Sequence, residues 1–170
     1  MANDKDFKVK NGIQPTVYHE GVGTVVSGSE GYYLAGASYD GISTQLTATG
    51  STESIFFKPN GLSVYFVVRD SGSSTSRIEQ FNLTTAWDLT TISSSSDESK
   101  DVGSNTGANG AGLAFSSDGT KMYVSNFTKV IYEYGLSTAW SVSTASYNSV
   151  SFTLSAVTNQ STSITFNDSG

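Results

Sequence analysis

Few residues in this sequence have the chemistry for acid–base catalysis or metal binding, and their spacing assembles no complete site. The 170-residue chain contains one histidine, His19, which is followed by Glu20, and it has no cysteine. A zinc site needs three or four histidine, cysteine or carboxylate ligands, and a Ser-His-Asp triad would have to use His19 itself. We therefore interpret His19 and Glu20 as residues of a solvated turn.

The remaining acidic and glycine-rich segments also have structural interpretations. Residues 97–101 (DESKD) lie in a serine-rich stretch without the spacing of an EF-hand, so we expect a solvated loop, with weak calcium binding as the alternative. Asp118 and Asp168 lie in turn motifs, where a carboxylate usually accepts hydrogen bonds from nearby backbone amides. The glycine-rich residues 21–24 and 103–112 lack the lysine of a phosphate-binding loop. We predict no catalytic, cofactor-binding or metal-binding residue, and no enzyme.

Composition favours a strand-rich, folded chain. Serine and threonine number 30 and 20, glycine 17 and proline only 2, while aromatic residues make up 12%. This aromatic content and the modest net charge of −6 argue against disorder, and the acidic balance argues against binding nucleic acid through its phosphates. No apolar run approaches the roughly 18–20 residues of a membrane helix, and the N-terminus has no secretory signal pattern.

A repeat of fifty-odd residues organises the chain. Residues 54–67 (SIFFKPNGLSVYFV) match residues 112–124 (GLAFSSDGTKMYV) at an offset of 58, and a third copy starts at 163–170 (SITFNDSG). A second block matches at an offset of 53, and it pairs residues 77–89 (RIEQFNLTTAWDL) with 130–142 (VIYEYGLSTAWSV). A third block pairs residues 37–46 with residues 145–154.

Each repeat is predicted to contain four short strands. The first three are expected at 55–58, 62–68 and 77–83 in one copy, and at 113–116, 121–126 and 130–136 in the next. The fourth is expected at 42–46 and at 150–154, with a weaker counterpart near Ile92. Asn-Gly and Asp-Gly in the first turns tolerate the positive φ of a tight hairpin. Trp87 and Trp140 are expected to fill the gap between adjacent repeats, with stacking on a ligand as the alternative.

Four antiparallel strands in such a unit are typical of a β-propeller blade. The fold class is therefore predicted as all-β, with two full blades and the start of a third in residues 32–170, after an extended segment at residues 1–31. A propeller needs about four to eight blades, so the ring is incomplete. We expect either a longer chain, of which this is the N-terminal part, or a homo-oligomer that closes the ring.

Residues 112–126 (GLAFSSDGTKMYVSN) resemble the blade motif of YVTN-type β-propeller repeats. The downstream blocks are similar to repeats of phage and marine bacterial propeller proteins, and the resemblance covers residues 32–170. Residues 6–13 (DFKVKNGI) resemble the opening of many tailed-phage fibre and virion proteins. The alternative for this segment is a strand that extends the first blade.

The resemblance implies a phage virion structural protein, a tail fibre or appendage component assembled in the host cytoplasm. Its N-terminal segment would bind other virion proteins, and its repeats would present loops to a host-surface glycan or protein, without membrane insertion. The alternatives are a bacterial surface or secreted propeller for adhesion or carbohydrate binding, and a propeller hydrolase.

Overall fold

The computed structural model describes residues 39, 41–43, 45, 50–70, 72, 74–156 and 160–166. The chain divides into two units, residues 1–41 and 42–170, and the second contains nearly all of the described residues. The predicted docking segment at residues 1–31 lies outside the described residues. Of the strand predicted at 42–46, residues 42, 43 and 45 are described, and none of them is in a strand.

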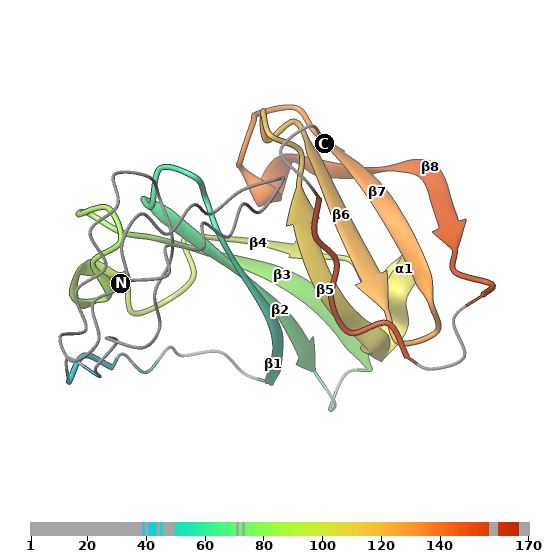
Figure 1. Cartoon of the computed structure of the whole chain (residues 1–170), viewed down its shortest axis with the longest axis horizontal. Coiled ribbons are helices and arrows are strands. Elements are labelled where there is room, and N and C mark those ends of the chain that lie inside the picture. The colour runs from blue at the N-terminus through green and yellow to red at the C-terminus, as the bar shows by residue number, and fades with distance from the viewer. Residues whose placement is uncertain are drawn as a thin grey trace, which may run out of the picture. The chain divides into compact units, whose positions relative to one another are not determined.

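The described residues form two four-stranded antiparallel sheets with little helix, so the all-β prediction is confirmed (Figure 1). In each sheet the strands follow chain order. The first sheet contains β1 (Ser51–Phe57), β2 (Ser63–Asp70), β3 (Thr75–Asn82) and β4 (Glu98–Asp101). The second contains β5 (Gly110–Phe115), β6 (Lys121–Asn126), β7 (Val130–Leu136) and β8 (Ala145–Thr153). No closed ring is formed by the part of the chain that the structure describes.

The short helical segments lie in the connections. The turns η1 (Leu89–Thr91) and η3 (Val142–Thr144) occupy equivalent places after the third strand of each sheet. Between the sheets, α1 (Gly103–Thr106) and η2 (Gly107–Asn109) carry the chain from β4 to β5. The glycine-rich segment 103–112 therefore serves as a connection and as the beginning of β5.

A glycine with positive φ closes the first hairpin of each sheet. Gly61 and Gly119 both have a φ of 71°, a conformation that side chains with a Cβ rarely adopt. The amide of Gly61 donates to the Lys58 carbonyl and that of Gly119 to the Ser116 carbonyl. These are the Asn-Gly and Asp-Gly turns expected from the sequence, and they bring each first strand into register with the second.

The two sheets pack face to face around one apolar core. From the first sheet, Tyr65, Val67 and Ile78 are completely buried in it. The second sheet contributes residues from four strands and from η3: Leu113, Phe115, Met122, Val124, Tyr134, Leu136, Val142 and Ala145. Because alternate side chains of a strand point to opposite faces, each sheet buries only one set of its residues here.

The opposite face of the first sheet has its own smaller cluster. Val64, Phe81 and Leu83 are buried there, and Phe57, Phe66 and Ile92 pack against them. Strand β2 is thus buried on both sides, which explains why it is an almost continuous apolar run rather than an alternating one. By the repeat alignment, Phe57 and Phe81 correspond to Phe115 and Tyr134 of the core between the sheets.

Some of the predictions for strands and loops needed correction. The acidic run 97–101, predicted as a solvated loop, is mostly strand β4, and the predicted fourth strand near Ile92 is only an isolated bridge between Leu83 and Ile92. Strand β4 forms because its backbone completes the ladder of β3, which pairs Gln80 with Glu98 and Arg77 with Asp101. Strand β8 begins at Ala145, five residues before the predicted start of 150. In contrast, β6 and β7 have the predicted bounds.

Candidate functional site

The two tryptophans have the same backbone geometry in the two sheets. Trp87 and Trp140 both have a positive φ, of 65° and 68°. The amide of Trp87 donates to the Gly61 carbonyl at 2.9 Å, and that of Trp140 donates to the Gly119 carbonyl at 3.0 Å. Each indole lies so close to its glycine that an added Cβ would overlap the ring. Both repeats therefore contain the same contact between the first hairpin and the chain that follows the third strand.

The surroundings of the two indoles differ. Trp140 lies in the contact between the sheets: its ring stacks on Phe56 with centroids 6.3 Å apart, and Lys58 Nζ lies 5.7 Å from the ring centroid. Trp87 packs beside Phe57 but is 59% exposed. The predicted packing of tryptophan between repeats is therefore confirmed for Trp140, whereas no sheet among the described residues covers Trp87.

Polar side chains of the first sheet fix the second sheet in place. The Glu98 carboxylate accepts hydrogen bonds from the Ser141 hydroxyl at 2.6 Å and from the amide and hydroxyl of Ser143 at 3.0 and 2.8 Å. Burial acts to raise the pKa of Glu98, but these hydrogen bonds outweigh it and lower the pKa below its usual range. The carboxylate is therefore used as a structural hydrogen-bond acceptor.

A tyrosine adds a second polar contact between the sheets. The Tyr65 hydroxyl donates to the Trp140 carbonyl at 2.9 Å. Burial is the main cause that raises the pKa of Tyr65 to about 12. The phenol is thus held neutral, as a donor, in the contact between the two sheets.

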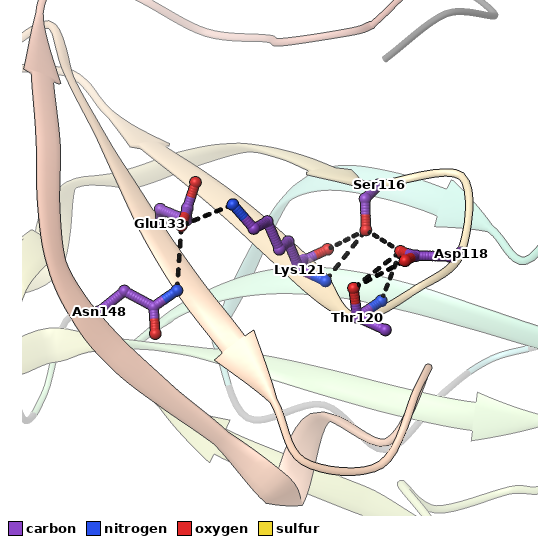
Figure 2. A network of polar contacts seen from close by, with 6 residues as sticks. All are labelled: Ser116, Asp118, Thr120, Lys121, Glu133 and Asn148. Atoms are coloured by element: carbon purple, nitrogen blue, oxygen red, sulfur yellow. Dashed lines mark hydrogen bonds and ion pairs between the residues drawn. The ribbon is translucent and has the colours of Figure 1, made fainter.

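The turn before β6 is closed by Asp118, as predicted from the sequence (Figure 2). Its carboxylate accepts from the Ser116 hydroxyl at 2.6 Å, and from the amide and hydroxyl of Thr120 at 3.0 and 2.8 Å. The hydrogen bond from Ser116 and then those from Thr120 lower the pKa of Asp118 to about 2.

Beyond this turn, Lys121 and Glu133 form an ion pair across β6 and β7. Lys121 Nζ lies 3.1 Å from Glu133 Oε1, and the same oxygen accepts from Asn148 Nδ2 at 3.0 Å (Figure 2). The hydrogen bond from Asn148, aided by Lys121, lowers the pKa of Glu133, and Glu133 raises the pKa of Lys121. The Lys121 side chain is 47% exposed, so the ion pair contributes little to stability.

The carboxylates of Asp118, Glu133 and Glu98 hold strands and turns together, and they are poorly suited to proton transfer. A general base is most effective when its pKa lies near the working pH, whereas the pKa values of Asp118, Glu133 and Glu98 are all lowered. In the described part of the chain, no three acidic or histidine side chains are grouped closely enough to hold a metal ion. His19, Glu20, Asp168 and the glycines of 21–24 lie outside the described residues.

The sequence interpretation missed the roles of Glu98 and Glu133. For Glu133 a signal existed: it pairs with Tyr123 in the ladder, so it shares a face with Lys121, two residues before Tyr123. For Glu98 there was none, because its partners lie more than forty residues further along the chain and meet it only when the sheets pack.

Comparison with known proteins gives no match: no family model fits the chain, and no curated sequence or solved structure is detectably similar to it. Among the described residues, no helix is long and apolar enough to cross a membrane.

Proposed function

We propose that the chain is a structural component of a tailed-phage particle, a tail fibre or appendage, in which stacked repeat sheets form a scaffold for exposed loops. The N-terminal segment, residues 1–31, would attach to other virion proteins. The repeats, residues 32–170, would present their loops to a glycan or protein of the host surface. In this proposal the two sheets are blades of β-propeller type.

The observation that carries the proposal is that the same contact recurs from one repeat to the next. Tyr65 of the first sheet packs on Phe115 of the second with ring centroids 4.7 Å apart. Tyr123, at the equivalent position of the second sheet, packs on Phe166 of the third copy with the same 4.7 Å separation. A face of each sheet thus receives the first segment of the following repeat in the same way, which supports stacking of blades about a common axis.

The exposed ends of the sheets are suited to variation without loss of the scaffold. The five extra residues of the first repeat lengthen the hairpin of β2 and β3: each of these strands has eight residues, whereas β6 and β7 have six and seven, and the connection is residues 71–74 against residues 127–129. Loops on a rigid sheet tolerate such insertions and often carry recognition. The polar contacts that join the sheets, such as those of Glu98, are distant in sequence from that loop, so changes in the loop leave them intact.

Mass spectrometry of purified phage particles tests the proposal. We expect peptides of this chain to co-purify with the major virion proteins through a density gradient, at a constant ratio to them across the particle fractions. A gold-labelled antibody against the loop at 70–75 should then bind at the tail. A chain found only in the unassembled fraction of the lysate, or only in the bacterial envelope, would refute the virion assignment and favour a cellular adhesion role.

A further inference from the structure

The outer face of the first sheet, which carries Val64, Val68 and Phe81, lies opposite the face that packs on the second sheet. These three side chains are completely buried. By the repeat alignment, Val64 and Phe81 correspond to Met122 and Tyr134, which are buried to the same degree in the core between the sheets. A sheet buries the side chains of one face only when a second layer lies on that face. The outer face therefore has a covering layer as well.

The described residues that pack on the outer face do not supply this layer. Phe57 and Phe66 belong to the first sheet itself, and Ile92 lies in the connection that follows β3. The segment at 160–166 lies against the far face of the second sheet. Apart from short pieces of loop and the last residues of the chain, this leaves the residues that precede β1.

The covering layer is narrow. Ile55 pairs with Phe66 and so lies on the outer face, yet it is 56% exposed. Leu89 in η1 is 38% exposed, whereas its equivalent Val142 in η3 is completely buried in the core between the sheets. The layer therefore covers β2 and β3 but neither β1 nor η1. This is the width of a single extended segment and not of a whole sheet.

The turn η1 also needs no carboxylate from a neighbouring sheet. In η3 the amide and hydroxyl of Ser143 donate to Glu98 of the first sheet. In η1 the equivalent amide and hydroxyl belong to Thr90, and both donate to Asp88 Oδ1, at 2.9 and 2.6 Å. Because Asp88 caps its own turn, no strand equivalent to β4 has to lie beside η1.

A buried carboxylate oxygen on the outer face calls for a donor in the covering layer. Glu79 pairs with Phe66 in the ladder and is buried, and its Oε1 accepts from Arg77 Nε at 2.7 Å. Its Oε2 is buried as well, and no hydrogen bond reaches it in the described part of the chain. An unpaired buried oxygen is costly. The layer should therefore bring hydroxyl or amide groups as well as apolar side chains.

Residues 42–49 (ISTQLTAT) have the position and composition that such a layer requires. They lead into β1 and belong to the same compact unit as the two sheets. At Gly50 an added Cβ would lie 3.1 Å from Val68 Cγ1, so the chain enters β1 beside the outer face. In an extended segment Ile42 and Leu46 point to the same side. The segment also has five hydroxyl or amide side chains and no charge, and eight residues reach about 26 Å, enough to cross two strands.

We propose that residues 42–49 lie across β2 and β3 on the outer face, with Leu46 against the cluster of Val64 and Phe81 and a polar side chain directed at Glu79. The first sheet is then the end of the stack, because its outer face is closed by the chain itself. Further sheets can add only beyond the second sheet. This inference goes beyond the proposed function and does not depend on the virion assignment.

Thiol reactivity in the full chain, which has no cysteine of its own, tests the proposal. Val64→Cys places a thiol under the proposed layer, and Val67→Cys places one in the core between the sheets; both should react slowly with iodoacetamide. In the Leu46→Asp background, Val64→Cys should react about tenfold faster, the factor expected when the burial of one leucine is lost, and Val67→Cys should keep its rate. Gln45→Asp is the matched control, since it adds the same charge at an exposed residue and should change neither rate.

A Val64→Cys thiol that stays slow in the Leu46→Asp background would overturn the proposal, because another segment would then cover the face. So would a Val64→Cys thiol that reacts fast without Leu46→Asp, or an equal acceleration of both thiols. A double-mutant cycle in urea unfolding gives a second readout with milder changes. The losses in unfolding midpoint from Leu46→Ala and Phe66→Ala should not be additive, whereas those from Leu46→Ala and Val67→Ala should add. Additive losses in both pairs would also overturn the proposal.

Discussion

The contact between Trp140 and the first hairpin of its sheet leads to a specific prediction for Gly119→Ala. Gly119 has a φ of 71°, and an alanine Cβ there would overlap the Trp140 indole. Trp140 cannot move aside easily, because Phe56, Phe115 and Lys58 surround its ring. Gly61→Ala is the matched change in the first sheet, with the same φ and the same contact to Trp87.

The two variants should differ in how much free energy of unfolding they lose. Holding a non-glycine residue at this φ costs about 1–2 kcal/mol. Forcing extra atoms into a packed site costs about 1–3 kcal/mol more. Because Trp87 is 59% exposed and can rotate into solvent, the loss of stability in Gly61→Ala should come mainly from holding an alanine at a positive φ. We therefore expect Gly119→Ala to lower the free energy of unfolding by about 2–5 kcal/mol, and Gly61→Ala by about 1–2 kcal/mol.

Urea unfolding of the two variants measures this difference, provided that the slope with denaturant is unchanged. The double variant Gly119→Ala/Trp140→Ala completes a cycle: once the indole is gone, Gly119→Ala should cost only the backbone term. Equal losses for Gly61→Ala and Gly119→Ala would refute the reasoning. So would an undiminished cost of Gly119→Ala in the Trp140→Ala background.

Three further changes test the polar contacts. Tyr65→Phe removes the hydrogen bond to Trp140 and should cost about 0.5–1.5 kcal/mol in urea unfolding. Since the pKa of Tyr65 is raised from 10.0 to about 12, its contribution is complete below pH 10 and is lost as the pH rises through 12; Tyr65→Phe should flatten that alkaline decline. The pKa of Glu98 is lowered, so its contribution exists above the unfolded pKa of about 4.3 and is lost at lower pH. Glu98→Gln should therefore be less stable at pH 7, and its melting temperature should fall less than that of the wild type on acidification. Asp118→Asn should show the same reduced acid dependence between about pH 4 and 2, because the pKa of Asp118 is about 2. Variants that follow the wild-type pH profile would contradict these assignments.

The repeat, the hairpins and most strands could be predicted from local sequence. Apolar alternation fixed β6 and β7, and Asn-Gly and Asp-Gly identified the turns at Gly61 and Gly119. Strand β4 could not be found this way, because Glu98-Ser99-Lys100-Asp101 has no strand propensity of its own. It is a strand only because its backbone pairs with that of β3, which lies some twenty residues earlier in the chain.

The sequence by itself determined where the first hairpin of each sheet turns and that Trp87 and Trp140 have equivalent places. Tertiary structure alone decided that Trp140 is covered while Trp87 is exposed, and that Glu98 receives the serines of the second sheet. The physical reason is the range, along the chain, of the interactions involved. Hairpins depend on the φ preferences and alternation of adjacent residues, whereas burial and hydrogen bonding between sheets depend on which faces meet, and the local pattern is the same in both repeats.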